Sequence, residues 1–140
     1  MKKVVVFFVV FVLLVLAGCS TSEQEVVDSV EGIVGTWNRG GGLETTICRH
    51  SDDGTLSCGR SLEQLDRGEG FFEARFWFED GKYHEQSDSA ECSATGVYEI
   101  FVQESGNLLF EVIEDECSNR KTGWVGSGGE EGEIEWEPLP

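Results

Sequence analysis

From Ile33 onward the apolar residues come in short runs, and Gly, Asp or Asn residues interrupt these runs about every eight to twelve residues. Both prolines, Pro138 and Pro140, lie at the C-terminus. This spacing is typical of an all-β domain in which short strands are joined by tight turns. About seven or eight such strands can close into a small antiparallel up-and-down barrel, which removes exposed sheet edges. A two-sheet sandwich fits the same pattern and remains the alternative.

The N-terminus has the regions of a secretory signal. Lys2 and Lys3 precede an unbroken apolar run over residues 4–16, which is shorter than the roughly 20 residues that a membrane span needs. Leu16-Ala17-Gly18-Cys19 follows and resembles the lipobox of bacterial lipoproteins. The resemblance implies cleavage after Gly18 and lipidation of Cys19. Several acyl chains on Cys19 would anchor the chain stably in a cell membrane or outer membrane.

Three parts of the chain follow from this pattern. Residues 1–18 form the signal peptide, and residues 19–31 carry the lipidated cysteine and a polar tether. Residues 32–140 form a single domain, with a Gly/Glu-rich segment at 126–133. The lipid on Cys19 places this domain in the periplasm or outside the cell.

The four cysteines beyond Cys19 predict two disulfides, because their number is even and an exported domain folds in an oxidising compartment. The segment 48–58 is typical of a hairpin with the loop Asp52-Asp53-Gly54. That register sets Cys48 opposite Cys58 and leaves Cys92 to pair with Cys117. A metal site is the rival. It is not expected, because there is no CxxC motif and only two histidines.

Two further hairpins, a short helix and a last strand are predicted. Residues 70–79 and 82–86 flank Asp80-Gly81, a strong turn signal. Residues 97–103 and 108–113 flank Ser105-Gly106-Asn107, and Ile100 opposite Val112 with Val102 opposite Phe110 gives one apolar face. Ser61 is expected to cap a helix over residues 61–66. A strand over residues 133–137 would close the domain.

The acidic balance excludes several partners. The chain has 10 Lys and Arg residues against 27 Asp and Glu residues, a formal net charge of −17. Such a charge repels phosphate backbones and anionic headgroups, so no nucleic-acid partner is expected and the lipid alone attaches the protein to the membrane.

No motif supports catalysis or a cofactor. The sequence has no GxSxG, HExxH or phosphate-binding glycine loop. His84 lies near Glu85 and Asp88 in a polar segment, where a solvated surface is the better interpretation than an acid–base pair. The acidic clusters lack the alternating spacing of a calcium loop. We therefore expect no enzyme, no metal and no cofactor.

A spaced set of residues resembles bacterial lipocalin-like domains of uncharacterised role, over residues 32–140. Its members are Gly35-Thr36-Trp37, Asp53-Gly54-Thr55, Gly96-x-Tyr98, Asp115-x-Cys117-x-x-Arg120 and Trp136. The resemblance implies that Gly35 and Trp37 close one end of the barrel and that Arg120 stacks on Trp37, a cation–π contact. The Gly/Glu-rich segment before Trp136 departs from the family pattern.

Aromatic residues are the remaining indication of function. Phe76-Trp77-Phe78 is apolar on both strand faces, so the aromatics either fill a core, meet a second layer or a lipid surface, or line a cavity. The leading hypothesis is a tethered module that binds a small apolar ligand. The second is an envelope structural or interaction protein with a filled core and an unidentified protein partner. The third is an enzyme inhibitor that uses the hairpin at 48–58.

Overall fold

The computed structural model describes residues 24–40, 45–126 and 134–140. The predicted signal peptide, Cys19 and residues 127–133 of the Gly/Glu-rich segment lie outside the described residues.

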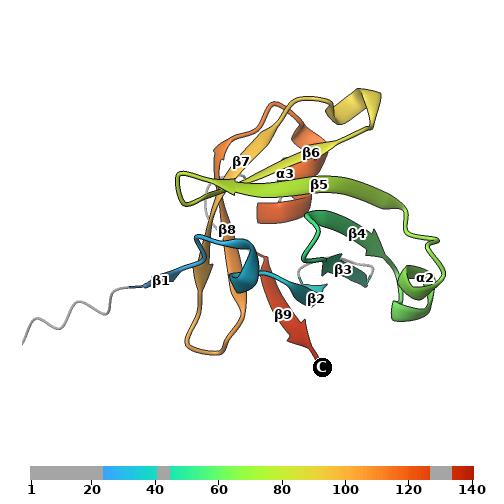
Figure 1. Cartoon of the computed structure of the whole chain (residues 1–140), viewed down its shortest axis with the longest axis horizontal. Coiled ribbons are helices and arrows are strands. Elements are labelled where there is room, and N and C mark those ends of the chain that lie inside the picture. The colour runs from blue at the N-terminus through green and yellow to red at the C-terminus, as the bar shows by residue number, and fades with distance from the viewer. Residues whose placement is uncertain (1–23, 41–44, 127–133) are drawn as a thin grey trace, which may run out of the picture.

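An up-and-down antiparallel barrel forms the body of the protein (Figure 1). Each strand from β2 to β8 pairs with the next one in the chain, so that β8 pairs with β9, and β9 pairs back with β2 to close the barrel. The predicted barrel is therefore confirmed, and the sandwich is excluded. The strands are β2 (Gly35–Arg39), β3 (Thr46–His50), β4 (Thr55–Gly59), β5 (Phe72–Glu79), β6 (Lys82–Ser87), β7 (Gly96–Val102), β8 (Leu108–Glu114) and β9 (Glu135–Leu139).

The domain begins earlier than the sequence predicted. Strand β1 (Glu25–Val26) pairs with the C-terminal half of β7, beyond the part of β7 that pairs with β6. The 3-10 helix η1 (Val30–Gly32) follows, and Val27 between them is 5% exposed and belongs to the core. The expected tether is thus structured from β1 onward, because Val27 gains more from burial than the polar residues around it lose.

All three predicted hairpins form, and one has a different register. Ile100 lies opposite Phe110 rather than Val112, and Val102 lies opposite Leu108. The loop is therefore residues 104–106, with Gly106 in its third position at a φ of 86°. Gly54 has the same third position and a φ of 80° in the loop at residues 52–54. The left-handed residue of a three-residue loop comes last, so glycine fixes the register. A shift of two residues preserves the apolar face.

Both predicted disulfides are present. Cys48 and Cys58 are Cα partners across β3 and β4, 4.1 Å apart. Cys92 and Cys117 join the short 3-10 helix η2 (Ala90–Cys92) to the start of α3, with Cα atoms 5.2 Å apart.

Two α-helices accompany the described strands. Helix α2 (Leu62–Asp66) is the predicted one, and the Ser61 hydroxyl accepts a hydrogen bond from the backbone N–H of Gln64 as its cap. Helix α3 (Ser118–Val125) was not predicted. It packs on β8, and Figure 1 shows it tucked against the strands. The sequence of α3 has too few apolar residues to show a helical pattern, because the helix buries only Arg120 and its last turn.

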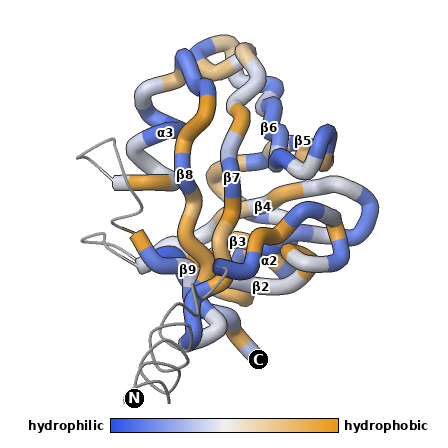
Figure 2. The backbone as a smooth tube through the Cα atoms, turned by 90° about the vertical axis from the view of Figure 1, so that its left-hand side faces the viewer, coloured by the Kyte–Doolittle hydropathy of each residue, from blue (hydrophilic) through white to orange (hydrophobic). Residues whose placement is uncertain are grey.

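The core lies inside the barrel and is built by alternate residues of the strands. Buried positions alternate with less buried ones along β3, β6 and the first part of β7, and Figure 2 shows hydrophobic stretches along β7 and β8. At one end of the barrel η1 leads into β2, and the indole N–H of Trp37 donates to the carbonyl of Ile33 at 2.9 Å. At the other end, where β2 and β4 end and β5 begins, lies α3. We call this the α3 end.

Candidate functional site

Aromatic rings fill the centre of the barrel. The ring of Phe110 lies 4.9 Å from that of Trp136, 5.6 Å from Tyr83 and 5.9 Å from Trp124, measured between centroids. All four side chains are buried. In the described structure the centre is thus a packed core, so a ligand site is to be sought at the barrel ends.

A chain of polar side chains runs through this core. His50 Nε2 lies 3.2 Å from the hydroxyl of Tyr83, which donates to Glu85 Oε2 at 3.1 Å. Trp124 Nε1 donates to the same oxygen at 2.7 Å. With the Tyr83 hydroxyl directed at Glu85, the hydroxyl oxygen accepts from His50 Nε2, a tautomer that is assigned from the network. His50 Nδ1 and Glu85 Oε1 have no partner among the described residues.

Burial keeps the side chains of His50 and Glu85 neutral near pH 7. Loss of hydration raises the pKa of Glu85 to about 8 and lowers the pKa of His50 to about 3. Glu85 therefore holds its proton, and His50 lacks one. Neither residue lines the pocket described below, so His50 and Glu85 are core residues that lie outside that pocket.

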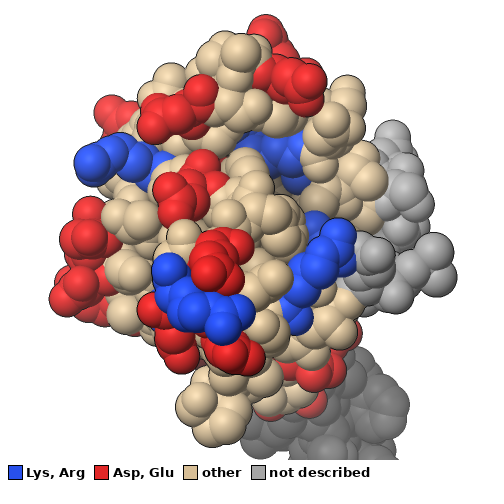
Figure 3. Space-filling view, turned by 90° about the vertical axis from the view of Figure 1, so that its right-hand side faces the viewer, with Lys and Arg blue, Asp and Glu red and all other residues tan. Residues whose placement is uncertain are grey.

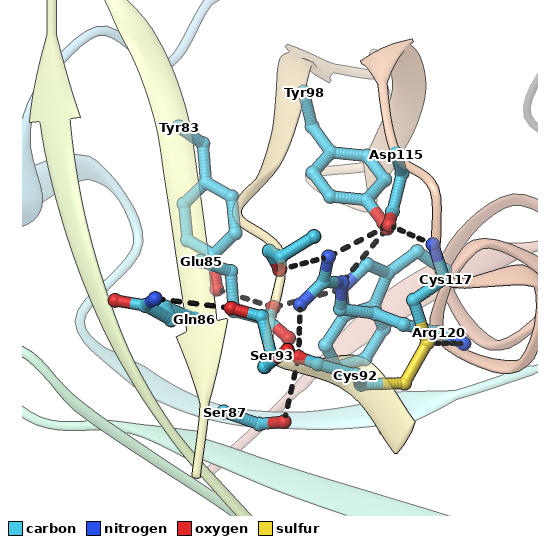
Figure 4. Close-up of polar contacts among 12 residues, drawn as sticks. Tyr83, Glu85, Gln86, Ser87, Cys92, Ser93, Tyr98, Asp115, Cys117 and Arg120 are labelled. Carbon is cyan, nitrogen blue, oxygen red and sulfur yellow. Dashed lines mark hydrogen bonds and ion pairs between the residues drawn. A yellow bond between two sulfur atoms is a disulfide. The ribbon is translucent and has the colours of Figure 1, made fainter. Parts of the chain in front are cut away.

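A buried ion pair lies nearer the α3 end (Figure 4). Arg120 of α3 binds Asp115 through two bonds, Nη2 to Oδ1 at 2.7 Å and Nε to Oδ2 at 2.8 Å. The hydroxyl of Tyr98 donates to the same carboxylate. Arg120 also donates to the backbone carbonyls of Ala94 and Cys92 at 2.8 and 3.4 Å. The side chains of Arg120 and Asp115 are 1% and 0% exposed.

The pair keeps its charges despite burial. Burial by itself favours the protonated carboxyl, but hydrogen bonds from Arg120 and Tyr98 hold the pKa of Asp115 below its usual value. Asp115 also accepts the backbone N–H of Cys117 at 2.8 Å, in the turn beside the disulfide. Gly96 is required here: a Cβ at this position would lie 2.8 Å from Asp115 Oδ2 and 2.9 Å from Arg120 Nε.

The expected stacking of Arg120 on Trp37 is wrong. Arg120 is held by Asp115 and by carbonyls of the segment that follows η2, while Trp37 is bound to Ile33 near η1. The aspartate three residues before the start of α3 offers a bidentate partner, which outweighs a cation–π contact for a buried guanidinium. Gly35 has a φ of 148° and lies beside the indole of Trp37.

A pocket of about 260 Å³ opens at the α3 end. Phe71 and Phe72 of the β5 side and Trp124 of α3 give it apolar walls, and the rings of Phe72 and Trp124 are 6.2 Å apart, edge to face. Thr46 at the start of β3 and the exposed Asn119 of α3 also line it. Apolar walls with a few polar groups are typical of small-molecule sites, although this volume is small for one.

Arg39, the last residue of β2, also lines this pocket. Its Nη1 donates to the carbonyl of Gly123 at 2.9 Å, and its Nε is buried without a partner in the described structure. No described carboxylate forms an ion pair with Arg39. Burial lowers the pKa of Arg39, yet a guanidinium stays charged.

The remaining polar candidates lie on the outside. Side chains alternate along β6, so His84 faces outward, stacked on Trp77 at 5.4 Å, while Glu85 faces inward. They form no acid–base pair. Within the described ranges no group of three or more His, Cys, Asp and Glu side chains has the arrangement of a metal site. Figure 3 shows acidic side chains over one face, with basic ones in separate groups between them.

Comparisons with known proteins give no relative. No protein-family model, curated protein or solved structure matches the chain. The search for spanning segments among the described residues finds no helix with the length and apolar content to cross a membrane.

Sequence reasoning missed several residues that the structure brings together. His50, Glu85, Arg39 and Trp124 were given no role. One signal was available for Glu85, because a strand that points Tyr83 into the core also points the residue two positions later inward. By the same rule Arg39 faces the inside of the barrel, because it follows Trp37 by two residues.

Proposed function

We propose that this protein is a bacterial lipoprotein, anchored by a lipid on Cys19, whose barrel binds a small and mostly apolar molecule without catalysing a reaction. The observation that carries the proposal is the pocket at the α3 end, an apolar concavity lined by Phe72 and Trp124 in a barrel whose centre is packed. The ligand sits at the mouth of the barrel and not in its centre.

The anchor is tested on the whole chain. Bacteria that express it are grown with radiolabelled palmitate and then separated into membrane and aqueous fractions. The protein is expected to carry the label and to sediment with membranes, whereas Cys19→Ser is expected to do neither. An unlabelled wild-type protein in the aqueous fraction would refute the anchor.

Ligand binding is tested on residues 20–140, which contain every described strand and both disulfides. The domain is exported into the periplasm, purified gently and analysed by native mass spectrometry. A reproducible added mass that denaturation removes is the expected result. Asn119→Trp places a bulky ring in the pocket from an exposed position and should remove the added mass. Thr122→Trp is the matched control, exposed on the same helix but away from the pocket.

The second candidate is an envelope interaction protein with a filled core. The packed aromatic centre favours this candidate, since buried aromatic side chains occupy the interior where a lipocalin-type cavity would lie. A bare mass for the wild-type domain, unchanged by a panel of apolar probes, would favour this candidate over the binding module.

A further inference from the structure

We propose that the pocket at the α3 end selects molecules with an apolar body and a single carboxylate, and that Arg39 binds the carboxylate. This inference rests on the proposed function and adds the chemical class of the ligand. It assigns Arg39 as the residue that determines specificity.

Arg39 points toward the inside of the barrel mouth. It follows Trp37 by two residues on the same face of β2, and its Cα partners are Thr46 of β3 and Trp136 of β9. Thr46 and Trp136 are themselves buried. A charged side chain in this position is set against apolar and hydroxyl groups, away from the acidic outer surface.

The guanidinium of Arg39 is only partly used. One bond, from Nη1 to the carbonyl of Gly123, holds it in place, while Nε is buried with no acceptor in the described structure. Arg120 lines the same pocket but is already paired with Asp115 and donates to two backbone carbonyls. In a chain with 27 acidic residues, a half-buried arginine that meets none of the described carboxylates is expected to obtain its anion from outside.

The surroundings favour a singly charged anion. Glu91 is exposed at the edge of the pocket, and the chain as a whole is strongly acidic. A dianion such as a phosphate monoester would keep one uncompensated charge near Glu91, whereas a carboxylate is neutralised by one guanidinium in a bidentate pair. The rings of Phe72 and Trp124 then cover the apolar body.

Octanoate and octan-1-ol are the probes, because they share a chain length and differ in charge. Binding to residues 20–140 is followed by tryptophan fluorescence, since Trp124 lines the pocket. Octanoate is expected to bind the wild-type domain about tenfold or more tightly than octan-1-ol. Arg39→Gln should remove this preference, because it weakens the binding of octanoate more than the binding of octan-1-ol. Glu91→Gln should keep the preference or increase it.

The outcomes separate the two proposals. If both probes bind equally and Arg39→Gln changes neither, the carboxylate inference is wrong although the pocket binds. If neither probe binds and Asn119→Trp changes nothing, the proposed function itself fails. The comparison of the two probes on the wild-type domain does not depend on whether Arg39→Gln folds, and Arg39→Lys, which keeps the charge but not the bidentate geometry, should show an intermediate preference.

Discussion

Trp124 donates its indole N–H to the carboxyl of Glu85 at 2.7 Å, across 39 positions of the chain. This bond ties α3 to β6 inside the barrel. It gives α3 a fixed depth, and it places the indole between the packed centre and the pocket.

Trp124→Phe is expected to destabilise the domain by about 2–4 kcal/mol, because it leaves a smaller ring and removes a donor from a buried carboxyl. The free energy of unfolding in urea measures this. Trp77→Phe is the control: Trp77 lies on the outer face and should cost less than about 1 kcal/mol. Equal losses in the two variants would contradict the role given to the bond.

Stability is expected to depend on pH in three regimes. Folding raises the pKa of Glu85 from 4.5 to about 8 and lowers the pKa of His50 from 6.5 to about 3. Between pH 4.5 and 6.5 the unfolded chain protonates His50 and the folded chain protonates Glu85. The two effects cancel, so these residues make the profile flat there.

Outside this window stability falls on both sides. From pH 6.5 to about 8 only the folded chain holds the Glu85 proton, and the free energy of unfolding should drop by about 2 kcal/mol. Below pH 4.5 the unfolded chain binds the extra proton at His50, and stability falls again toward pH 3. Urea titrations at fixed pH values measure the profile. Glu85→Gln should abolish the alkaline fall, and an unchanged slope in this variant would assign that fall to another group.

Asp115→Asn is expected to cost about 3–5 kcal/mol, because it leaves the guanidinium of Arg120 buried without its counter-charge. Asp66→Asn gives the comparison. It breaks the ion pair with Arg49, in which the side chains of Arg49 and Asp66 are 35% and 65% exposed, and should cost at most about 1 kcal/mol. Chemical denaturation of both variants measures the difference, and similar values would show that the buried pair adds no more than a surface pair.

Replacing Cys92 and Cys117 together by serine should lower stability by about 3 kcal/mol, since the disulfide closes a loop with a sequence separation of 25. A serine at position 117 can keep the cap that Cys117 Sγ provides to the N–H of Arg120. Thermal unfolding under oxidising conditions measures the loss. The wild-type domain treated with a reductant serves as the reference, and a double variant as stable as the oxidised wild type would refute the expectation.

Local patterns in the sequence were enough for the strands, the turns and the disulfides. Glycine at the end of a three-residue loop, alternation along a strand and an even number of cysteines are short-range signals, and each produced the predicted feature. The predicted register of β7 and β8 was wrong because Gly106 was placed in the middle of its loop. Placing the glycine last in the three-residue loop, as at Gly54, gives the observed register.

The candidate site depended on contacts between distant segments, which no local pattern encodes. The sequence determined an all-β domain of short antiparallel strands with two disulfides, because strand period and turn chemistry act over a few residues, and the tertiary structure decided between barrel and sandwich. Only the tertiary structure decided that α3 covers one mouth, that Arg120 binds Asp115 instead of Trp37, and that Arg39 faces a pocket without a carboxylate. The physical reason is that a buried charge pairs with a group that lies within hydrogen-bond distance once the barrel has closed. Strands that are far apart in the chain set that distance.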